Sequence, residues 1–186
     1  MKILVLSAGG NPGTNTDQVA DAFIKGAAES GHNVSKVNLG KLEISDCRGC
    51  GACQKNGNRC VVQDDMQSLY EKFKECDAFV MASPLYFWSI TGRLKCFLDR
   101  LYAISTEDKY PEKKTALLMT SGDDRTWTFD HVVSFYHVIT QIYGGHDLGT
   151  CLIGGCTGCE GNRKLPDGAL DKAYQFGKSI KSEEGK

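Results

Sequence analysis

The sequence predicts an α/β fold, a doubly wound three-layer sandwich built on a five-stranded parallel sheet. Short apolar runs alternate with amphipathic segments of helix length along the whole chain, which is typical of repeated strand–helix–strand units. The runs are rich in Val, Leu and Ile, as expected of strands that are buried on both faces. A length of 186 residues suits one domain. We therefore expect a single domain over residues 1–186, with a frayed tail at about 181–186.

Strands and helices are expected to alternate from the first residues onward. The strands are placed at Lys2–Ser7, Val34–Asn38, Ala78–Ala82, Thr115–Thr120 and Asp147–Ile153. The first helix covers about Thr14–Ser30, and the second begins at Asp64 or Asp65, which are both good N-cap residues. Apolar stripes at helical spacing mark the next two helices, with Leu94, Phe97, Leu98 and Leu101 in the third and Val132, Phe135, Tyr136, Ile139 and Ile142 in the fourth. The last helix runs from about Asp167 to Ile180. These stripes are expected to face the core.

Composition narrows the classes of function. Hydrophobic residues make up 41% of the chain, charged residues 24%, and the net charge is -1, so neither disorder nor a nucleic-acid-binding surface is indicated. The apolar run after Met1 is too short for a secretory signal or a membrane span. We therefore expect a cytoplasmic protein with no membrane or nucleic-acid partner. Its nine cysteines are expected to serve as thiols rather than as structural disulfides.

The loop after the first strand is rich in glycine and short polar side chains. Three glycines precede three polar residues where the first helix begins, in the stretch SAGGNPGTNT. Backbone N–H groups and the helix dipole attract an anion at such a place, and hydroxyl or amide side chains add donors. The stretch predicts a phosphate-binding loop formed by Ser7, Thr14, Asn15 and Thr16. The alternative is an ordinary tight turn with a threonine cap.

The loop after the third strand carries aromatic residues where a soluble protein normally has polar ones. Tyr86, Phe87 and Trp88 follow Pro84 and Leu85. Ligands of doubly wound folds bind at the carboxyl edge of the sheet, so aromatic residues there indicate a flat apolar ligand. Alternatively, Phe87 and Trp88 tuck under the loop or contact a second subunit.

Four cysteines form the most distinctive motif, Cys47-x2-Cys50-x2-Cys53-x6-Cys60. Such a run can place four thiolates around one iron–sulfur cubane or one zinc ion. Because the run follows the second strand, we expect it at the same edge of the sheet as the other loops. The alternative is a loop of small half-buried residues that is empty or linked by a disulfide.

The other cysteines are assigned structural roles. Cys156 and Cys159 follow the last strand with two residues between them. A redox dithiol is one interpretation, but a plain loop pair is favoured because no helix opens directly at the motif. Cys76 and Cys96 are expected to be buried thiols of the core.

The chain resembles the NADPH-dependent FMN reductase family of the flavodoxin-like fold. The resemblance rests on the loop from Ser7 to Thr16, on Ser83-Pro84-Leu85-Tyr86 with the segment 91–95 beyond it, and on Thr120-Ser121-Gly122. The four clustered cysteines make the chain more similar to the iron–sulfur flavoprotein branch of that family. The resemblance covers residues 1 to about 180 and implies the strand order 2-1-3-4-5.

The resemblance also implies a set of binding residues. The FMN phosphate is assigned to Ser7, Thr14, Asn15 and Thr16. The isoalloxazine is assigned to Pro84, Leu85, Tyr86 and Phe87, with backbone amides near its N1 and O2 edge, and to Ser121 and Gly122 from the next loop. A 4Fe-4S cluster is assigned to Cys47, Cys50, Cys53 and Cys60. No catalytic side chain is expected, because the flavin carries the chemistry.

We therefore expect an FMN-dependent NAD(P)H oxidoreductase. Hydride would pass from the nicotinamide to the flavin, and electrons would then pass to a small acceptor such as a quinone, free flavin, nitro or azo compound, or to an iron–sulfur centre. A homodimer or homotetramer is expected, since the aromatic stretch is too apolar to leave exposed. Two rival functions are an electron carrier between protein partners such as a ferredoxin, and a zinc-stabilised binding domain without flavin.

Overall fold

A five-stranded parallel sheet with the strand order β2-β1-β3-β4-β5 forms the centre of the molecule. The computed structural model describes residues 1–107 and 109–181. The strands span Lys2–Ser7 (β1), Asn33–Asn38 (β2), Ala78–Pro84 (β3), Lys114–Thr120 (β4) and His146–Ile153 (β5). All neighbouring strands are parallel. The predicted fold class and strand order are confirmed.

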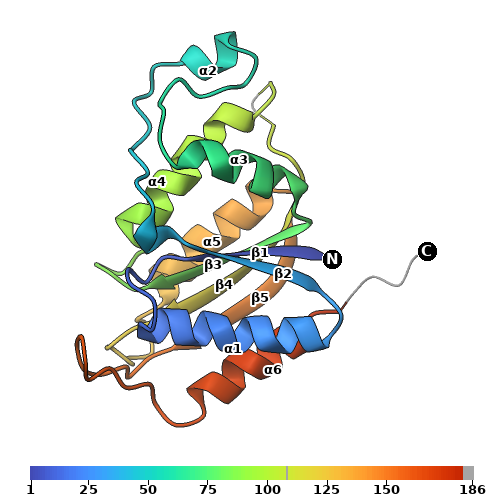
Figure 1. The fold of residues 1–186 in the computed structure, drawn as a ribbon. Coiled ribbons are helices and arrows are strands. Elements are labelled where there is room, and N and C mark those ends of the chain that lie inside the picture. The colour runs from blue at the N-terminus through green and yellow to red at the C-terminus, as the bar shows by residue number, and fades with distance from the viewer. Residues whose placement is uncertain (108, 182–186) are drawn as a thin grey trace.

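Helices cover both faces of the sheet (Figure 1). On one face lie α1 (Asn15–Glu29) and α6 (Ala169–Ser179), and on the other lie α3 (Met66–Glu75), α4 (Gly92–Arg100) and α5 (Asp130–Ile142). The chain also forms a one-turn helix, α2 (Ala52–Lys55), and two 3-10 turns, η1 (Leu39–Lys41) and η2 (Leu101–Ile104). Alternate residues of β1 enter the two cores, with Ile3 and Val5 facing α1 and α6, and Leu4 and Leu6 facing the other three helices.

The differences from the expected elements lie mostly at the edges. The central strands β1, β3 and β4 are buried almost throughout, whereas β2 and β5 are partly exposed because an edge strand has a neighbour on one side only. Ile142, expected in the core, is 44% exposed at the end of α5, and Cys96 is only half-buried. The turns α2, η1 and η2 were not expected. Beyond Lys181, the expected frayed tail lies outside the described residues.

No helix in the described part of the chain is long and apolar enough to cross a membrane.

Candidate functional site

The carboxyl ends of four strands surround a cavity of about 260 Å³, hereafter the sheet-edge cavity. Ligands of doubly wound folds bind at this edge. The lining residues come from four loops and are Gly9, Thr14, Asn15, Thr16, Pro84, Leu85, Tyr86, Thr120, Ser121, Gly122, Cys156, Gly158 and Arg163. They include every residue that was assigned to FMN except Ser7 and Phe87.

The first loop wraps tightly around the start of α1. Gly9 has no room for a side chain, because a Cβ there would lie 2.3 Å from the Thr14 hydroxyl oxygen. Thr14 is the N-cap of α1, and its hydroxyl accepts the N–H of Asp17 at 3.3 Å. The hydroxyl of Thr16 pairs with that of Thr120 at 2.6 Å. The positive end of the helix dipole is therefore surrounded by hydroxyl groups at the cavity.

Asn15 presents an atom that lacks a partner. Its side-chain Oδ1 is buried and has no hydrogen-bond partner among the described residues, although the residue lines the cavity. A buried acceptor left without a donor is costly. A ligand that brings hydroxyl groups together with a phosphate would satisfy this acceptor and use the helix N-terminus. The loop therefore fits FMN, whose ribityl chain and phosphate carry those groups.

Asp17 also shapes the first loop. Its buried carboxylate accepts the Ser7 hydroxyl and the Gly13 N–H, both at 2.9 Å, and pairs with Lys36 at 2.7 Å. Burial raises the pKa of this carboxyl, but the hydrogen bonds from Lys36, Gly13 and Ser7 outweigh burial and hold the pKa below its ordinary value. Ser7 thus lies fully buried behind the loop with its hydroxyl engaged. Contact of Ser7 with a phosphate stays a prediction.

The loop after β3 is held by main-chain hydrogen bonds. The Leu85 N–H donates to a carbonyl at the end of β4 at 2.7 Å, and Tyr86 and Ser89 exchange bonds of 3.0 and 3.1 Å. The amides of Leu85 and Tyr86, expected at the isoalloxazine edge, therefore already donate within the protein. Between the paired residues, Phe87 and Trp88 have left-handed φ values of 48° and 56°. Bulky residues rarely adopt this conformation, which is enriched at functional sites.

The two large rings of this turn have different surroundings. Phe87 is 95% exposed and does not line the sheet-edge cavity. Trp88 stacks on Trp127 from the loop after β4, with ring centroids 5.9 Å apart, and Arg125 covers the Trp127 ring at 4.3 Å. Both tryptophans stay more than 40% exposed. The turn therefore presents an apolar surface beside the cavity, where a ligand or a second subunit can contact it.

The loops after β4 and β5 form the last wall of the cavity. The Ser121 N–H donates to the carbonyl of Ile153, and the Cys156 N–H donates to the carbonyl of Ser121, both at 2.9 Å. A Cβ on Gly122 would lie 3.3 Å from the Cys156 carbonyl oxygen. Arg163 supplies a cation, which the first loop lacks. The sequence analysis missed Arg163, and the one signal that could have suggested its role is its position after the last strand.

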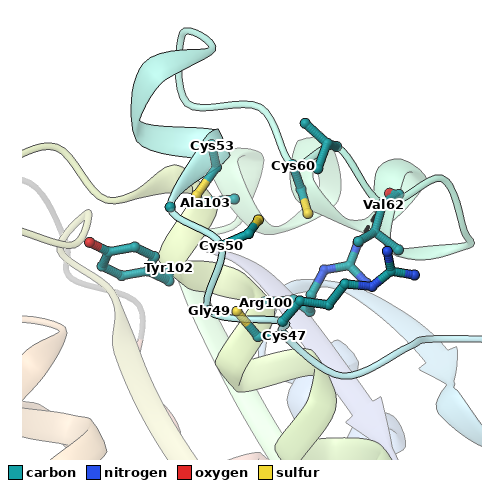
Figure 2. Close-up of a pocket in the computed structure, with 12 residues that line it drawn as sticks. Cys47, Gly49, Cys50, Cys53, Cys60, Val62, Arg100, Tyr102 and Ala103 are labelled. Carbon is teal, nitrogen blue, oxygen red and sulfur yellow. Dashed lines mark hydrogen bonds between the residues drawn. The ribbon is translucent and has the colours of Figure 1, made fainter.

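The four clustered cysteines line a second cavity of about 320 Å³, hereafter the cysteine cavity. Figure 2 shows the thiols of Cys47, Cys50, Cys53 and Cys60 around one hollow. The two glycines between the first three cysteines have left-handed φ values of 61° and 64°, which let the loop turn between one thiol and the next. All nine cysteines fall within the described residues and are free thiols, so the disulfide-linked alternative is not observed.

The donor set of the cysteine cavity suits a cluster. Within residues 1–107 and 109–181, no three His, Cys, Asp or Glu side chains are placed to hold a single metal ion. A cubane needs wider spacing than one ion, because each of its four irons takes one thiolate. Four thiols around a common hollow supply the kind of donor that a 4Fe-4S cluster takes.

The cysteine cavity does not lie at the carboxyl edge of the sheet, where it was expected. Residues 42–46 run from η1 toward the far end of α4, and Leu42 and Ile44 pack against the core on the way. The cysteine cavity is completed by Arg100, Tyr102 and Ala103 at the C-terminal end of α4. Figure 1 shows the loop with α2 projecting beyond α3 and α4, away from the sheet. Nine residues of helix, about 13 Å, separate this end of α4 from the sheet edge.

Known proteins resemble this chain in sequence and in fold. Residues 1–144 match the NADPH-dependent FMN reductase family. An iron–sulfur flavoprotein of Methanosarcina thermophila is 27% identical over 144 residues, which cover 77% of this chain and 75% of the relative. Another from Methanocaldococcus jannaschii is 26% identical over 186 residues, or 97% of this chain and 95% of the relative. The NAD(P)H:quinone oxidoreductase from Methanothermobacter marburgensis has a similar fold, with a TM-score of 0.73 at 17% identity over 100% of this chain and 98% of that one.

Proposed function

Because this chain belongs to the NADPH-dependent FMN reductase family and is therefore an FMN-dependent oxidoreductase, we propose that it passes electrons from NAD(P)H to a quinone, free flavin or similar small acceptor. The observation that carries the proposal is the sheet-edge cavity, where a hydroxyl-rich helix start meets the unpartnered Oδ1 of Asn15. Bound FMN supplies the redox chemistry, since it takes a hydride from a nicotinamide and returns two electrons to an acceptor.

The residues of the cavity bind and orient the cofactor. Thr14, Asn15 and Thr16 hold the phosphate end at the start of α1, where the helix dipole favours an anion. The ring end lies between the β3 loop, from Pro84 to Tyr86, and the tightly tied loops after β4 and β5. Arg163 provides positive charge in the same cavity, and a fixed cation stabilises negative charge on a bound ligand. Because NAD(P)H and the electron acceptor would occupy the same cavity in turn, we expect ping-pong kinetics.

The four clustered cysteines are proposed to hold a 4Fe-4S cluster. The shared cavity and the all-thiol donor set support this assignment, as do the iron–sulfur flavoprotein names of the two relatives. Free thiols in such numbers suit the reducing cytoplasm, which is where we place the protein. A cluster at the projecting end of the molecule favours a second candidate function, an electron carrier between protein partners such as a ferredoxin.

An anaerobic preparation tests both functions. Flavin and iron counts, with the absorption spectrum, establish the cofactors. Steady oxidation of NAD(P)H with a small quinone supports the reductase, whereas reduction only by a donor protein supports the carrier. Protein that neither binds FMN nor oxidises NAD(P)H would sink the proposal.

The cluster assignment is tested by Cys53→Ser. This variant should lose the paramagnetic signal seen after dithionite and keep its flavin absorbance, because Cys53 lines the cysteine cavity and not the sheet-edge cavity. Cys159→Ser is the matched control, since Cys159 is exposed and lines neither cavity. An unchanged signal in Cys53→Ser contradicts the assignment.

A homodimer or homotetramer is also proposed. Tyr86 and Phe87 are 61% and 95% exposed beside the sheet-edge cavity, and apolar patches of this kind are typical of subunit contacts. Light scattering at micromolar concentration should give at least twice the chain mass. A monomer that binds FMN at full affinity contradicts the prediction.

A further inference from the structure

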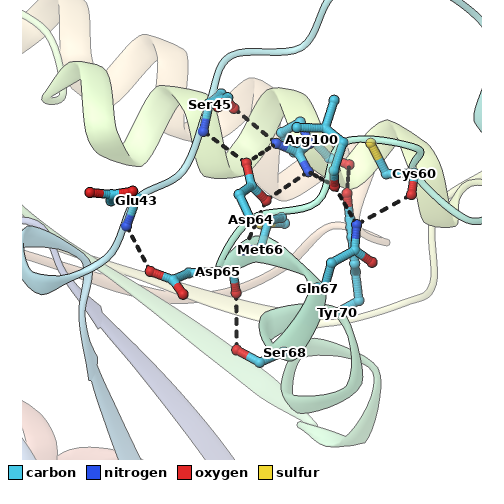
Figure 3. Close-up of polar contacts among 11 residues, drawn as sticks. Glu43, Ser45, Cys60, Asp64, Asp65, Met66, Gln67, Ser68, Tyr70 and Arg100 are labelled. Atoms are coloured by element: carbon cyan, nitrogen blue, oxygen red, sulfur yellow. Dashed lines mark hydrogen bonds and ion pairs between the residues drawn. The ribbon is translucent and has the colours of Figure 1, made fainter.

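Arg100, the last residue of α4, is only 1% exposed. Arginine is rarely buried unless its charge is paired. Both oxygens of Asp64 accept from its terminal nitrogens, at 2.6 Å from Nη1 and 3.0 Å from Nη2, in a bidentate ion pair (Figure 3). Nη1 also donates to the carbonyl of Ser45 at 3.0 Å, and Nη2 donates to that of Val62 at 3.3 Å. We refer to this ion pair as the Arg100–Asp64 clamp.

The clamp joins the two ends of the loop that carries the four clustered cysteines, hereafter the cysteine loop. We call these joined ends the neck of the loop. Ser45 and Val62 stand two residues outside the first and the last of the four clustered cysteines. Asp64 also accepts the N–H of Ser45 at 2.9 Å, and the side-chain amide of Gln67 donates to the carbonyl of Val62. One buried ion pair thus fixes both ends of a loop whose only regular structure is the single turn of α2.

One donor of Arg100 remains unused. The guanidinium has five N–H groups, and the terminal nitrogens use four of them in the contacts above. The fifth, at Nε, is buried and has no partner among the described residues. Arg100 lines the same cavity as the four thiols, and its guanidinium keeps one donor that no described residue uses. The sulfur atoms of iron–sulfur clusters accept hydrogen bonds, which tune the cluster potential.

We propose that the Arg100–Asp64 clamp positions the cysteine loop for a 4Fe-4S cluster and that the Nε–H of Arg100 donates to that cluster. The inference rests on the cluster function proposed for the same four cysteines. The clamp has two separable effects, because it fixes the neck of the loop and sets the local charge. Reduction makes the cluster more negative, so a neighbouring cation raises its reduction potential and a neighbouring carboxylate lowers it.

Two opposite substitutions separate charge from loop closure. Arg100→Met leaves the Asp64 carboxylate alone and should lower the cluster potential. Asp64→Asn leaves the Arg100 cation alone and should raise it. A neck that is merely loosened would shift both potentials in the same direction. The potentials are read from the paramagnetic signal during a dithionite titration of anaerobically reconstituted protein, with no need for turnover.

A double variant keeps the test informative if an unpaired buried charge prevents folding. Arg100→Met/Asp64→Leu replaces the pair by apolar side chains, a change that proteins often tolerate. It should fold and bind FMN, but lose iron to a chelator about 10-fold faster than wild type, as expected when a supporting partner of a metal site is lost. The matched control, Glu71→Leu/Lys74→Met, removes the exposed ion pair of α3 and should keep the wild-type rate.

The outcomes distinguish the clamp from the cluster itself. If wild-type protein holds iron and the double variant retains it equally long, or if both single variants shift the potential in the same direction, the clamp is overturned and the cluster assignment stands. If wild-type protein takes up no iron after anaerobic reconstitution, the cluster and the clamp are both overturned, while the flavin absorbance still reports on the sheet-edge cavity.

Discussion

Replacing Asn15 with Ala should separate ligand binding from folding. The Oδ1 atom of Asn15 is buried without a partner among the described residues, so its removal costs the apoprotein no hydrogen bond. Ala is also the better helix former at this first residue of α1. We expect the apoprotein to be at least as stable as wild type, by up to about 1 to 3 kcal/mol in the free energy of unfolding, because the cost of burying an unpartnered acceptor is removed. The FMN affinity should fall by about 1 to 3 kcal/mol, or roughly 5- to 150-fold in Kd, because a buried polar ligand group loses its partner.

Two measurements check this prediction. Quenching of flavin fluorescence during titration of the apoprotein gives Kd, and urea unfolding with and without FMN gives the stabilisation by ligand. At FMN concentrations 100 times the wild-type Kd, wild type should gain about 2.7 kcal/mol, and a variant that binds 10-fold more weakly about 1.4 kcal/mol. Lys25→Ala is the matched control, since this residue lies exposed on the same helix and does not line the cavity. Equal affinity of Asn15→Ala and wild type would refute the assignment of this loop to FMN.

Two further predictions concern stability. Asp17→Asn should destabilise the protein by about 2 to 3 kcal/mol near pH 7, because the Gly13 N–H, the Ser7 hydroxyl and Lys36 lose a buried carboxylate. The folded-state pKa of Asp17 lies below 3.8, so this stabilisation is complete above pH 3.8 and is lost as the pH falls through the folded pKa. Urea unfolding should therefore show the free energies of unfolding of wild type and Asp17→Asn converging in acid. A difference that stays constant with pH would contradict the assignment. Phe87→Gly should be about 1 kcal/mol more stable than Phe87→Ala, the reverse of the usual order, because the φ of 48° strains any residue with a Cβ. The usual order in denaturation midpoints would argue against that strain.

The sequence predicted the first loop and the start of α1, because the interactions that form them are local. The glycine-rich turn and the cap of α1 are contained within ten residues, and Thr14, Asn15 and Thr16 do meet at the predicted cavity. The topology of a parallel sheet then predicted which other loops join them, because the carboxyl ends of the strands lie at one edge. Pro84 and Ser121 therefore fall beside the first loop even though more than 60 residues of chain separate each of them from it.

Contacts between distant residues limited what the sequence could reveal. Ser7 has the side chain of a phosphate donor, yet its hydroxyl is taken by Asp17, whose burial depends on Lys36 from the neighbouring strand. Arg100 ends an amphipathic helix and looks like an ordinary solvated cation until folding brings Asp64 beside it. In each case the pattern identified the residue type and its element. The partner that decides its role lies on another element, outside the reach of a local pattern.

The two cavities depend on the fold in different ways. The sheet-edge cavity is formed by four loops that follow four parallel strands, so forming the sheet is enough to bring its walls together. The cysteine cavity is formed by the C-terminal end of α4 and one loop, whose ends converge on the guanidinium of Arg100. A change at that residue can therefore remove the second site and leave the sheet intact. Thr91 caps α4 near the sheet edge, and Arg100 ends the same helix at the cysteine cavity. Because one helix spans the two sites, a cluster and a flavin in this chain would keep a separation set by α4, whichever acceptor takes the electrons.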